Sequence, residues 1–410
     1  MTAPVGWPGS RVAPKTGGMI CRACHGVRGA LVLDLGKQPP CDYFPDAGDP
    51  SPDPLYPLQM WLCESCGLAQ LVADPTLSEE PRGAEPAALV AQAAAAVDAV
   101  GAAGLLPPGG RVAEYGSPHG GSWLGLLAGQ GLRPVDDHQA ADVIVDCFGM
   151  MHAADQAEAL AERAWRLAPG GTLLLQYHAL ATIIRCGQWN ALRHGHYAYY
   201  STTALTAMLA AYGLRPRRAW QFDLYGGTVL LAAGSATGAH GRLHDSVRAL
   251  LEEDERAGVR KASVLRLLQR EVGFRAGALH EWLVTQRAAK ATVLGYGAAS
   301  RAVSYLKWAD IDSSLLPAVA DASAAKHGRR MPGTDIPIVD PGVLIERRPD
   351  VVLLFLPDLL EEVRRSVPEV EDSGATWMDV DALASPGAPA ATDSRSITDE
   401  KATLIPRGSR

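Results

Sequence analysis

Apolar and polar positions along the middle of the chain follow a regular pattern of alternating strands and helices. From residue 111, the runs RVAEYG, LRPVDD, ADVIVDCFG and TLLLQYH have the apolar character of buried strands. The runs SWLGLLAGQG and DQAEALAERAWRLAPGG repeat apolar residues at helical spacing. Strands and helices that alternate in this way predict a parallel sheet with helices on both faces over residues 109–237.

A second unit of the same kind begins near residue 291. The runs ATVLGYG, LLPAVAD, IPIVD and DVVLLFLP predict its strands, so residues 291–383 are expected to form a further Rossmann-like domain. Residues 238–290 carry Leu, Arg and Glu at helical spacing. This stretch is predicted to form helices that bridge the two sheets.

The N-terminal part of the chain has short strand-like runs in place of this alternation. ALVLDLG and MWLCESCGLAQLV predict a small β-rich module over residues 19–75. The run PAALVAQAAAAVDAV predicts a linker helix within 76–108, because alanine loses least on entering a helix. Residues 1–18 and 384–410 are rich in Gly, Pro, Ala and Ser and are expected to be disordered. The final LIPRGSR resembles a protease-site remnant of an expression tag.

Composition narrows the class of partner. A chain of 410 residues is expected to form two or three domains, each with its own core. The formal charge of -7 offers no basic face for nucleic acid or for an anionic membrane, so the expected partner is a small molecule. No apolar run reaches the roughly 18 residues that span a bilayer, and the start lacks a secretory pattern, so we expect a cytoplasmic protein.

Four of the seven cysteines have the spacing of a metal site. Cys21 and Cys24 form one CxxC pair, and Cys63 and Cys66 form another. Two such turns suit tetrahedral zinc, because each brings two sulfurs to the ion. Four thiolates leave no open position for water, so the zinc is predicted to be structural; the alternative is unliganded surface cysteines.

Two glycine-rich segments lie between a predicted strand and a predicted helix. EYGSPHGG contains Glu114, Gly116, His119 and Gly120, and Asp136 ends the next strand. Glycines let a ligand approach the backbone, and an acidic residue at the next strand end can hold ribose hydroxyls. The alternative is a sheet that binds nothing at this edge. The second segment, GYGAAS at 295–300, could cradle a phosphate or simply form a tight turn.

The stretch RHGHYAYYS at 193–201 has two interpretations. Histidines and tyrosines so close together suit an acid/base centre. They also suit an aromatic network within a folded core.

Together these motifs resemble a known family. CxxC…CxxC, EYGSPHGG, HGHYAYYS, YGGT, GYGAASRAVSYLKWADID and PGTDIPIVDP are similar to the three-domain sugar C-methyltransferases, over about residues 19–380. The resemblance implies an α/β fold with a zinc module, a central S-adenosylmethionine domain and a C-terminal Rossmann-like domain. In that family the three domains surround the substrate, a nucleotide-linked keto-deoxysugar, and the resemblance implies a role in the biosynthesis of natural-product sugars. A base removes the proton next to the ketone, and the enolate attacks the methyl group of the sulfonium.

The resemblance also assigns residues. The His-Glu-His motif of the family, usually preceded by Tyr, falls on Arg193, His194, Gly195 and His196. His196 is then the expected base, with Tyr197, Tyr199 or His194 orienting it or donating to the enolate oxygen. The His-Gly-Gly loop of the family becomes Tyr225, Gly226 and Gly227. The nucleotide diphosphate is expected at the 295–300 loop, with Gly297 in that loop and Arg301 or Lys326 supplying charge.

Two departures from the family keep alternatives open. EEPRGAEPAALV replaces the Tyr- and Ser-containing segment that closes over the sulfonium. Only HQAA separates Asp137 from the next strand, where a methyltransferase domain has a helix, an edge strand and another helix with adenine contacts. The leading hypothesis is C-methylation in a shortened cofactor pocket. The alternatives are a cofactor-independent keto-sugar epimerase or isomerase that uses the same base, and a non-catalytic scaffold that binds a nucleotide sugar.

Overall fold

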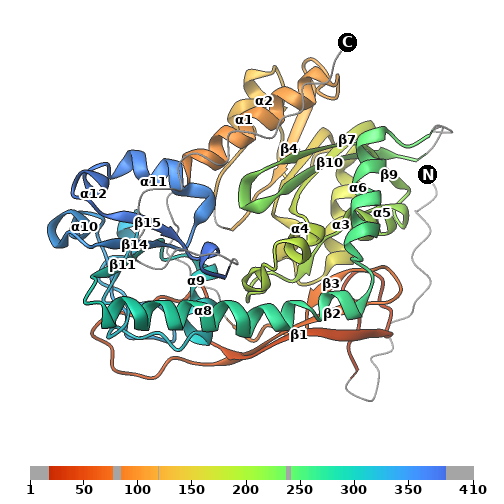
Figure 1. Cartoon of the computed structure of the whole chain (residues 1–410). Coiled ribbons are helices and arrows are strands. Elements are labelled where there is room, and N and C mark those ends of the chain that lie inside the picture. The colour runs from red at the N-terminus through yellow and green to blue at the C-terminus, as the bar shows by residue number, and fades with distance from the viewer. Residues whose placement is uncertain (1–17, 77–84, 119, 237–241, 385–410) are drawn as a thin grey trace, which may run out of the picture.

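The computed structural model describes residues 18–76, 85–118, 120–236 and 242–384. Nearly all of the predicted disordered arm and tail, the first residues of the EEPRGAEPAALV segment and His119 lie outside this part of the chain. The strands form three sheets, and Figure 1 shows them around a common centre. No helix in the described ranges is long and apolar enough to cross a membrane.

The first sheet is antiparallel and has the order β1-β2-β3-β8. Its strands are β1 (Gly29–Gln38), β2 (Tyr56–Cys63), β3 (Ala69–Leu71) and β8 (Ala198–Tyr199). The first three belong to the predicted β-rich module. The fourth comes from far along the chain, and Tyr199 pairs with Ala69 in the sheet. A segment of the RHGHYAYYS stretch is therefore part of the N-terminal sheet.

The second sheet has six strands in the order β5-β4-β6-β7-β10-β9. They are β4 (Arg111–Tyr115), β5 (Arg133–Pro134), β6 (Ala141–Cys147), β7 (Leu167–His178), β9 (Leu214–Phe222) and β10 (Thr228–Ser235). The strands β5, β4, β6 and β7 are parallel, as predicted, whereas β10 runs antiparallel to both β7 and β9. The sheet is therefore mixed.

Helices cover both faces of this sheet. One face packs against α1 and α2, and the other against α3, α5 and α6. Side-chain caps start three of them, because Asp155 accepts from Glu158 N, Ser201 from Ala204 N and His244 from Ser246 N. The helices of this region are α1 (Ala87–Ala102), α2 (Leu124–Gly129), α3 (Gln156–Arg166), α4 (Leu180–Arg185), α5 (Thr202–Ala210) and α6 (Asp245–Ala257), with short 3₁₀ turns η1 (Met150–His152), η2 (Trp189–Ala191) and η3 (Leu224–Gly226).

The edge of the second sheet at β5 is short. The chain passes from Asp136 to β6 with no intervening strand, as the four-residue HQAA link requires. Arg166 of α3, with 2% of its surface exposed, closes this edge: its guanidinium donates to Asp136 O at 3.0 Å and to the Tyr115 hydroxyl at 3.0 Å. A buried arginine thus satisfies a backbone carbonyl at the open side of the sheet.

The third sheet is parallel and has the order β13-β12-β11-β14-β15, which is the 3-2-1-4-5 strand order of a Rossmann-like fold. Its strands are β11 (Val293–Tyr296), β12 (Val319–Ala320), β13 (Ile338–Val339), β14 (Val351–Leu354) and β15 (Thr376–Asp379). The helices are α9 (Ser300–Trp308), α10 (Gly342–Arg347), α11 (Leu360–Ser366) and α12 (Glu369–Asp372), with turns η4 (Ala324–Lys326), η5 (Pro357–Leu359) and η6 (Ala382–Ala384). The predicted α/β fold class, with its shortened central sheet, is confirmed.

Two connections hold the three sheets together. Helix α7 (Ala262–Leu265) and the 21-residue helix α8 (Leu268–Ala288) run from the second sheet to the third beside β1 (Figure 1). The segment between β1 and β2 reaches the third sheet, where Asp53 forms a buried ion pair with Arg330 at 2.7 Å. The N-terminal module therefore contacts the other two sheets.

Candidate active site

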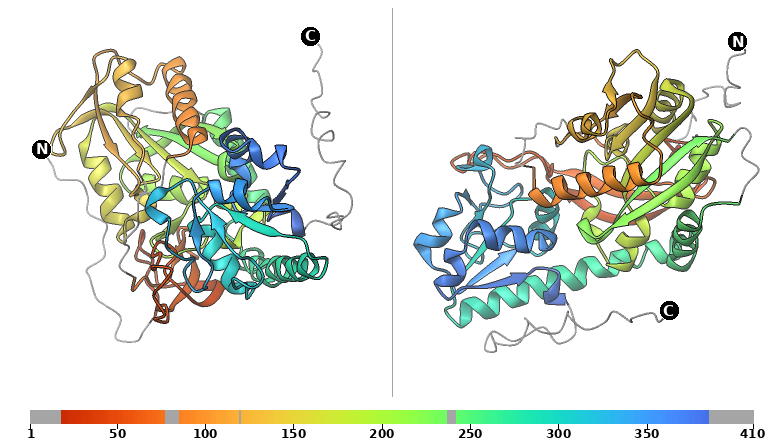
Figure 2. Two further views of the ribbon diagram at one scale, coloured as in Figure 1. Left: turned by 90° about the vertical axis from the view of Figure 1, so that its left-hand side faces the viewer. Right: turned by 90° about the horizontal axis from the view of Figure 1, so that it is seen from above.

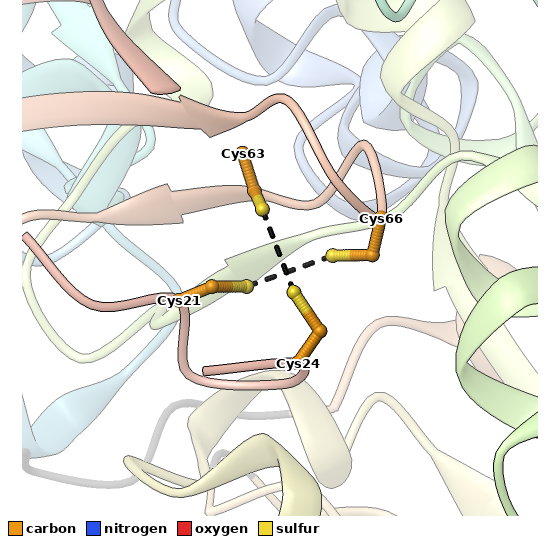
Figure 3. A group of neighbouring side chains, drawn as sticks. All are labelled: Cys21, Cys24, Cys63 and Cys66. Carbon is orange, nitrogen blue, oxygen red and sulfur yellow. Dashed lines mark hydrogen bonds between the residues drawn. The ribbon is translucent and has the colours of Figure 1, made fainter. Parts of the chain in front are cut away.

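The four cysteines of the two CxxC pairs converge on one point (Figure 3). The Sγ atoms of Cys21 and Cys66 lie 3.6 Å apart, as do those of Cys24 and Cys63, and all four lie within 4.8 Å of one another. A tetrahedral ion with Zn–S bonds of about 2.3 Å needs sulfurs about 3.8 Å apart. The sulfurs therefore fit a zinc ion.

Backbone turns hold the four sulfurs in place. Cys21 N donates to Gly26 O at 2.9 Å, and Cys63 N donates to Leu68 O at 2.9 Å. Gly67 has a φ of +80°, which a residue with a side chain rarely adopts. All four donors are protein sulfurs, so this is a closed, structural site without a position for substrate.

A separate cavity of about 250 Å³ lies where the three sheets meet. The carboxyl ends of parallel strands supply much of its wall, as in other open α/β sheets. Segments after β4 and β6 and the end of β7 line it from the second sheet, and the start of α9 with its neighbours lines it from the third. The RHGHYAYYS stretch completes the wall. These parts contribute Ser117, Gly120, Gly121, Cys147, Phe148, Gln176, Tyr177 and His178, then Ala299, Ser300, Arg301, Lys326 and Leu356, and finally Arg193, His196, Ala198, Tyr199 and Tyr200.

The backbone of the RHGHYAYYS stretch is fixed by groups from three parts of the chain. Gly195, with a φ of +81°, donates from its N–H to Asp74 Oδ2 at 2.5 Å. Its carbonyl lies 2.9 Å from His152 Nδ1 of η1. The hydroxyl of Tyr199 accepts from Arg193 N at 3.0 Å, which closes the loop on itself. The stretch is therefore held as a rigid support for the side chains that face the cavity.

His196 forms part of the cavity wall and is 5% exposed. Arg193 Nε lies 2.9 Å from His196 Nε2 and 3.3 Å from His196 Nδ1, so it stands over the ring and not in line with the lone pair of either nitrogen. The ring of His152 stands edge-on to His196, with 4.6 Å between the ring centres. Arg193 also contacts the hydroxyl of Ser300 at the start of α9. The base predicted from the sequence therefore lies where the second and third sheets meet.

A second cation borders the same cavity. Arg301 Nη2 lies 3.3 Å from His178 Nδ1, and its guanidinium is 5.3 Å from the centre of the Tyr225 ring. Burial, followed by the charge of Arg193, lowers the pKa of Arg301 to about 10, so it stays charged at neutral pH. Burial and the two guanidinium charges hold the pKa of His178 well below its usual value. His178 is therefore a neutral acceptor for Arg301.

Three of the predicted catalytic side chains have other surroundings. His194 contacts the N-terminal module, with Nε2 3.3 Å from Pro57 O, and burial lowers its pKa. Tyr197 packs under the guanidinium of Arg22, which lies 4.8 Å from the ring centre. Tyr199 reaches the cavity wall, but its hydroxyl is bonded to the backbone of Arg193. Among these residues, His196 has the most direct access to the cavity.

In the glycine-rich loop after β4, residues 114–121, some of the described residues hold the loop in place and others line the cavity. Glu114 accepts from Trp123 N at 2.5 Å and from the Ser122 hydroxyl at 2.6 Å, so it fixes the loop. Gly116 and Asp136 do not line the cavity, while Gly120 forms part of its wall with a φ of +100°. Asp136 is exposed just beyond β5, the strand that pairs with β4.

Of the substrate-binding residues predicted in the third sheet, one packs within the fold and another lines the cavity. Gly297 has a φ of +95°, and a Cβ there would lie 3.0 Å from Leu356, so this glycine packs a tight turn. Lys326 forms part of the cavity wall; its Nζ donates to Ala298 O at 2.8 Å and lies 4.8 Å from the centre of the Phe44 ring. Tyr225 also lines the cavity, with a φ of +58°.

Two further residues of the site were missed by the sequence motifs: His178 and His152. His178 had a usable signal, because it ends a buried parallel strand, where ligands bind in open α/β sheets. His152 had none, because its importance depends on contact with His196, far away in the sequence. Ser300 ends the predicted 295–300 loop, but its contact with Arg193 could not be predicted.

Two family models match the chain. "C-methyltransferase C-terminal domain" covers residues 223–380, and "Putative zinc binding domain" covers residues 21–76. The four cysteines fall within the second match, which together with their convergence confirms the predicted zinc module.

A curated relative agrees with these matches. The C-methyltransferase NovU of Streptomyces niveus is 24% identical over 232 residues, which are 57% of this chain and 54% of the relative. The chain thus matches about half the length of this relative. The resemblance to C-methyltransferases drawn from the sequence is confirmed.

Solved structures with similar parts include two methyltransferases. Magnesium protoporphyrin IX methyltransferase from Synechocystis PCC 6803, with bound SAH, has 12% identity and a TM-score of 0.27, covering 36% of this chain and 84% of that chain. An O-methyltransferase family protein from Burkholderia thailandensis has 16% identity and a TM-score of 0.27, covering 37% of this chain and 57% of that chain.

Proposed function

We infer that this chain, a relative of the C-methyltransferases through both its zinc-binding and its C-terminal domain, is an enzyme that methylates a carbon next to a ketone. The proposed substrate is a nucleotide-linked keto-deoxysugar. One observation carries the proposal: a single cavity brings together Gly120 of the glycine loop, His196 and Arg301 of the C-terminal domain. A methyl donor, a base and a nucleotide sugar must meet at one place for this reaction.

His196 is the proposed base. It takes the proton from the carbon next to the ketone, and the electron pair of that C–H bond moves to form the enolate. Imidazole suits this step because it changes protonation near neutral pH. The guanidinium of Arg193 lies over the His196 ring, and its positive charge opposes the arrival of a proton there, so the substrate oxygen must draw Arg193 away from the ring. Substrate binding then frees the base.

The enolate oxygen needs donors that are in place before the charge develops. We assign this role to Arg193 and Arg301 in place of Tyr197, Tyr199 and His194. Both guanidiniums border the cavity, and neither lies within ion-pair distance of a carboxylate among the described residues. A negative charge that develops in the cavity would therefore interact favourably with two positive charges.

The residues at the glycine loop fit S-adenosylmethionine in part. Gly120 leaves room for a ligand against the backbone, because a Cβ there would meet nothing within 4 Å, and the exposed carboxylate of Asp136 lies beyond the end of the neighbouring strand. These groups would hold the amino-acid end and the ribose, respectively. When bound, the cofactor supplies an electrophilic methyl group. The short edge closed by Arg166 leaves less protein surface for adenine.

The nucleotide diphosphate is proposed to lie against the third sheet. The N-terminus of α9 borders the cavity, and its first residues, Ser300 and Arg301, line the wall with Lys326. Helix N-termini and cationic side chains are suited to phosphate oxygens. This arrangement would place the sugar between the diphosphate site and His196.

The test uses a nucleotide-linked keto sugar in D₂O, with and without S-adenosylmethionine. Deuterium entry at the carbon next to the ketone, together with a methylated product when the cofactor is present, supports the proposal. His196→Gln should lower both by roughly 10²-fold or more. His194→Gln is the matched control, because that ring lies outside the cavity, and it should remain near the unmodified rate.

The short sheet edge favours one alternative, a keto-sugar epimerase or isomerase that returns a proton to the enolate. Deuterium exchange without any methylated product, and no heat released on titration with S-adenosylmethionine, would establish that alternative. No deuterium entry with any keto sugar under either condition would contradict both reactions and leave a binding scaffold.

A further inference from the structure

Positive and negative side chains lie on different sides of the active-site cavity. Three basic residues border it: Arg301 and Lys326 belong to the third sheet, and Arg193 contacts the start of α9 there. Among the described residues of the wall, Glu85 alone carries a carboxylate. A cavity whose opposite charges are separated in this way suits ligand groups of opposite charge.

Glu85 lies against the glycine-rich loop after β4, on the side of the second sheet. Gly121 has a φ of +85°, and a Cβ placed on it would lie 2.6 Å from Glu85 Oε1. The same loop contributes Ser117 and Gly120 to the cavity wall. The carboxylate therefore stands beside the place where Gly120 leaves room for the methyl donor.

The other carboxylate at this loop is already engaged. One oxygen of Glu114 accepts from Trp123 N at 2.5 Å, and the other accepts from the Ser122 hydroxyl at 2.6 Å. Glu85, in contrast, forms no ion pair with any residue that the structure describes. Its negative charge is therefore available to a ligand.

The chain at Glu85 is held by a contact between α1 and the third sheet. Pro86 precedes the helix, and Ala87 N and Ala88 N donate to the two carboxylate oxygens of Glu362 in α11, at 2.9 and 3.0 Å. The start of α1 accordingly lies beside the helices of the third sheet (Figure 2). Glu362 satisfies the first N–H groups of α1 and offsets the positive end of the helix, so Glu85 is not required as a cap.

The negative charge of Glu85 acts on other parts of the cavity wall. Burial, followed by the charges of Glu114, Asp146 and Glu85, raises the pKa of the Cys147 thiol at the end of β6. Burial likewise raises the pKa of Tyr225, and Glu85 contributes in the same direction. A positive charge that enters this part of the cavity is favoured by the same field.

We propose that Glu85 is the counter-charge for the sulfonium of S-adenosylmethionine, an inference that rests on the methyl transfer proposed above. The methyl group must reach a substrate carbon inside the cavity, so the sulfonium belongs on the cavity side of the glycine-rich loop, where Glu85 stands. As the enolate carbon bonds to the methyl group, the electron pair of the methyl–sulfur bond stays on sulfur, and the product S-adenosylhomocysteine lacks this positive charge. Glu85 therefore favours the methyl donor over the spent product.

Calorimetric titration of the full-length chain with S-adenosylmethionine and, separately, with S-adenosylhomocysteine tests the proposal without measuring turnover. Glu85→Gln removes the charge and keeps the size of the side chain. It should weaken binding of the methyl donor about fivefold and leave binding of the product within about twofold of the unmodified value. Glu85→Asp keeps the charge and should retain part of the preference for the methyl donor.

Salt dependence and a matched variant separate this charge effect from a general weakening of the site. Added salt should weaken binding of the methyl donor more in the unmodified protein than in Glu85→Gln, because ions screen an exposed carboxylate. Asp98→Asn removes another exposed carboxylate near the cavity, further along α1 but outside the wall. It should change neither dissociation constant.

The possible outcomes distinguish this inference from the proposed function. Two results would overturn the inference alone: Glu85→Gln weakens both ligands equally, as loss of a contact with their shared ammonium group would, or it weakens neither. If the unmodified protein binds neither ligand, the proposed methyl transfer is wrong, and the inference is wrong with it.

Discussion

The ion pair between Asp53 and Arg330 should be one of the largest single contributions to the stability of this chain. Arg330 Nη1 and Nη2 lie 2.7 and 2.8 Å from the two carboxylate oxygens of Asp53, and Gly333 N donates to the same carboxylate at 2.5 Å. The side chains of Arg330 and Asp53 are 8% and 6% exposed. Asp53→Asn would leave a buried guanidinium without its counter-charge, which costs about 3–5 kcal/mol.

The cost in unfolding free energy depends on how exposed the ion pair is, more than on its length. A second ion pair of the chain serves as a matched control. Arg364 Nε lies 2.6 Å from Glu371 Oε1, yet these side chains are 36% and 40% exposed. Glu371→Gln should therefore cost less than about 1 kcal/mol. The two substitutions remove the same kind of charge from pairs of similar length.

Thermal denaturation compares the two variants, and hydrogen exchange locates the effect, because a chain with three sheets need not unfold in one step. Asp53→Asn should lower protection in residues 40–55 and around Arg330. It should also weaken substrate binding, because Lys326 of the cavity wall packs on Phe44 of the same segment. Equal melting temperatures for both variants, with unchanged exchange in residues 40–55, would refute the reasoning.

Three other predictions concern separate sites. Cys63→Ser should abolish zinc binding, measured by elemental analysis, and unfold the N-terminal module, because the metal supplies much of its stability. Burial raises the pKa of Asp254 to about 6, so between about pH 4 and pH 6 the folded state holds a proton on this carboxyl that the unfolded state has lost. The free energy of unfolding should therefore fall by up to about 3 kcal/mol as pH rises from about 4 to about 6. Asp254→Asn should flatten that profile of melting temperature against pH. Arg166→Met should cost about 1–3 kcal/mol and speed hydrogen exchange at residues 136–140, because Asp136 O loses its donor.

The sequence predicts the elements whose patterns are local. The alternation of strands and helices predicts β4 to β7 and β11 to β14, and the CxxC spacing predicts the sulfur cluster. The short HQAA link predicts the lack of a further edge strand, because four residues cannot form a helix, a strand and a second helix.

Contacts between distant segments could not be predicted in this way. Strand β8 has only two residues, too few for a periodic pattern, and its partner β3 lies far away in the sequence. The distance between His196 and Arg193 depends on a loop held by Asp74, which no sequence pattern connects to them. The surroundings of Tyr197 and His194 are likewise set by contacts with distant parts of the chain.

The insertion of β8 into the zinc module's sheet affects how a chelation experiment should be interpreted. His196 comes just before β8, and its loop is anchored to Asp74, just beyond β3. A chelator that loosens the CxxC turns would therefore also displace the proposed base, although none of the four sulfurs lines the cavity. The loss of turnover would imitate that of an enzyme with a catalytic metal. Refilling the site with another tetrahedral ion, such as cadmium, should restore turnover, because the ion acts on the reaction centre only by holding the fold in shape.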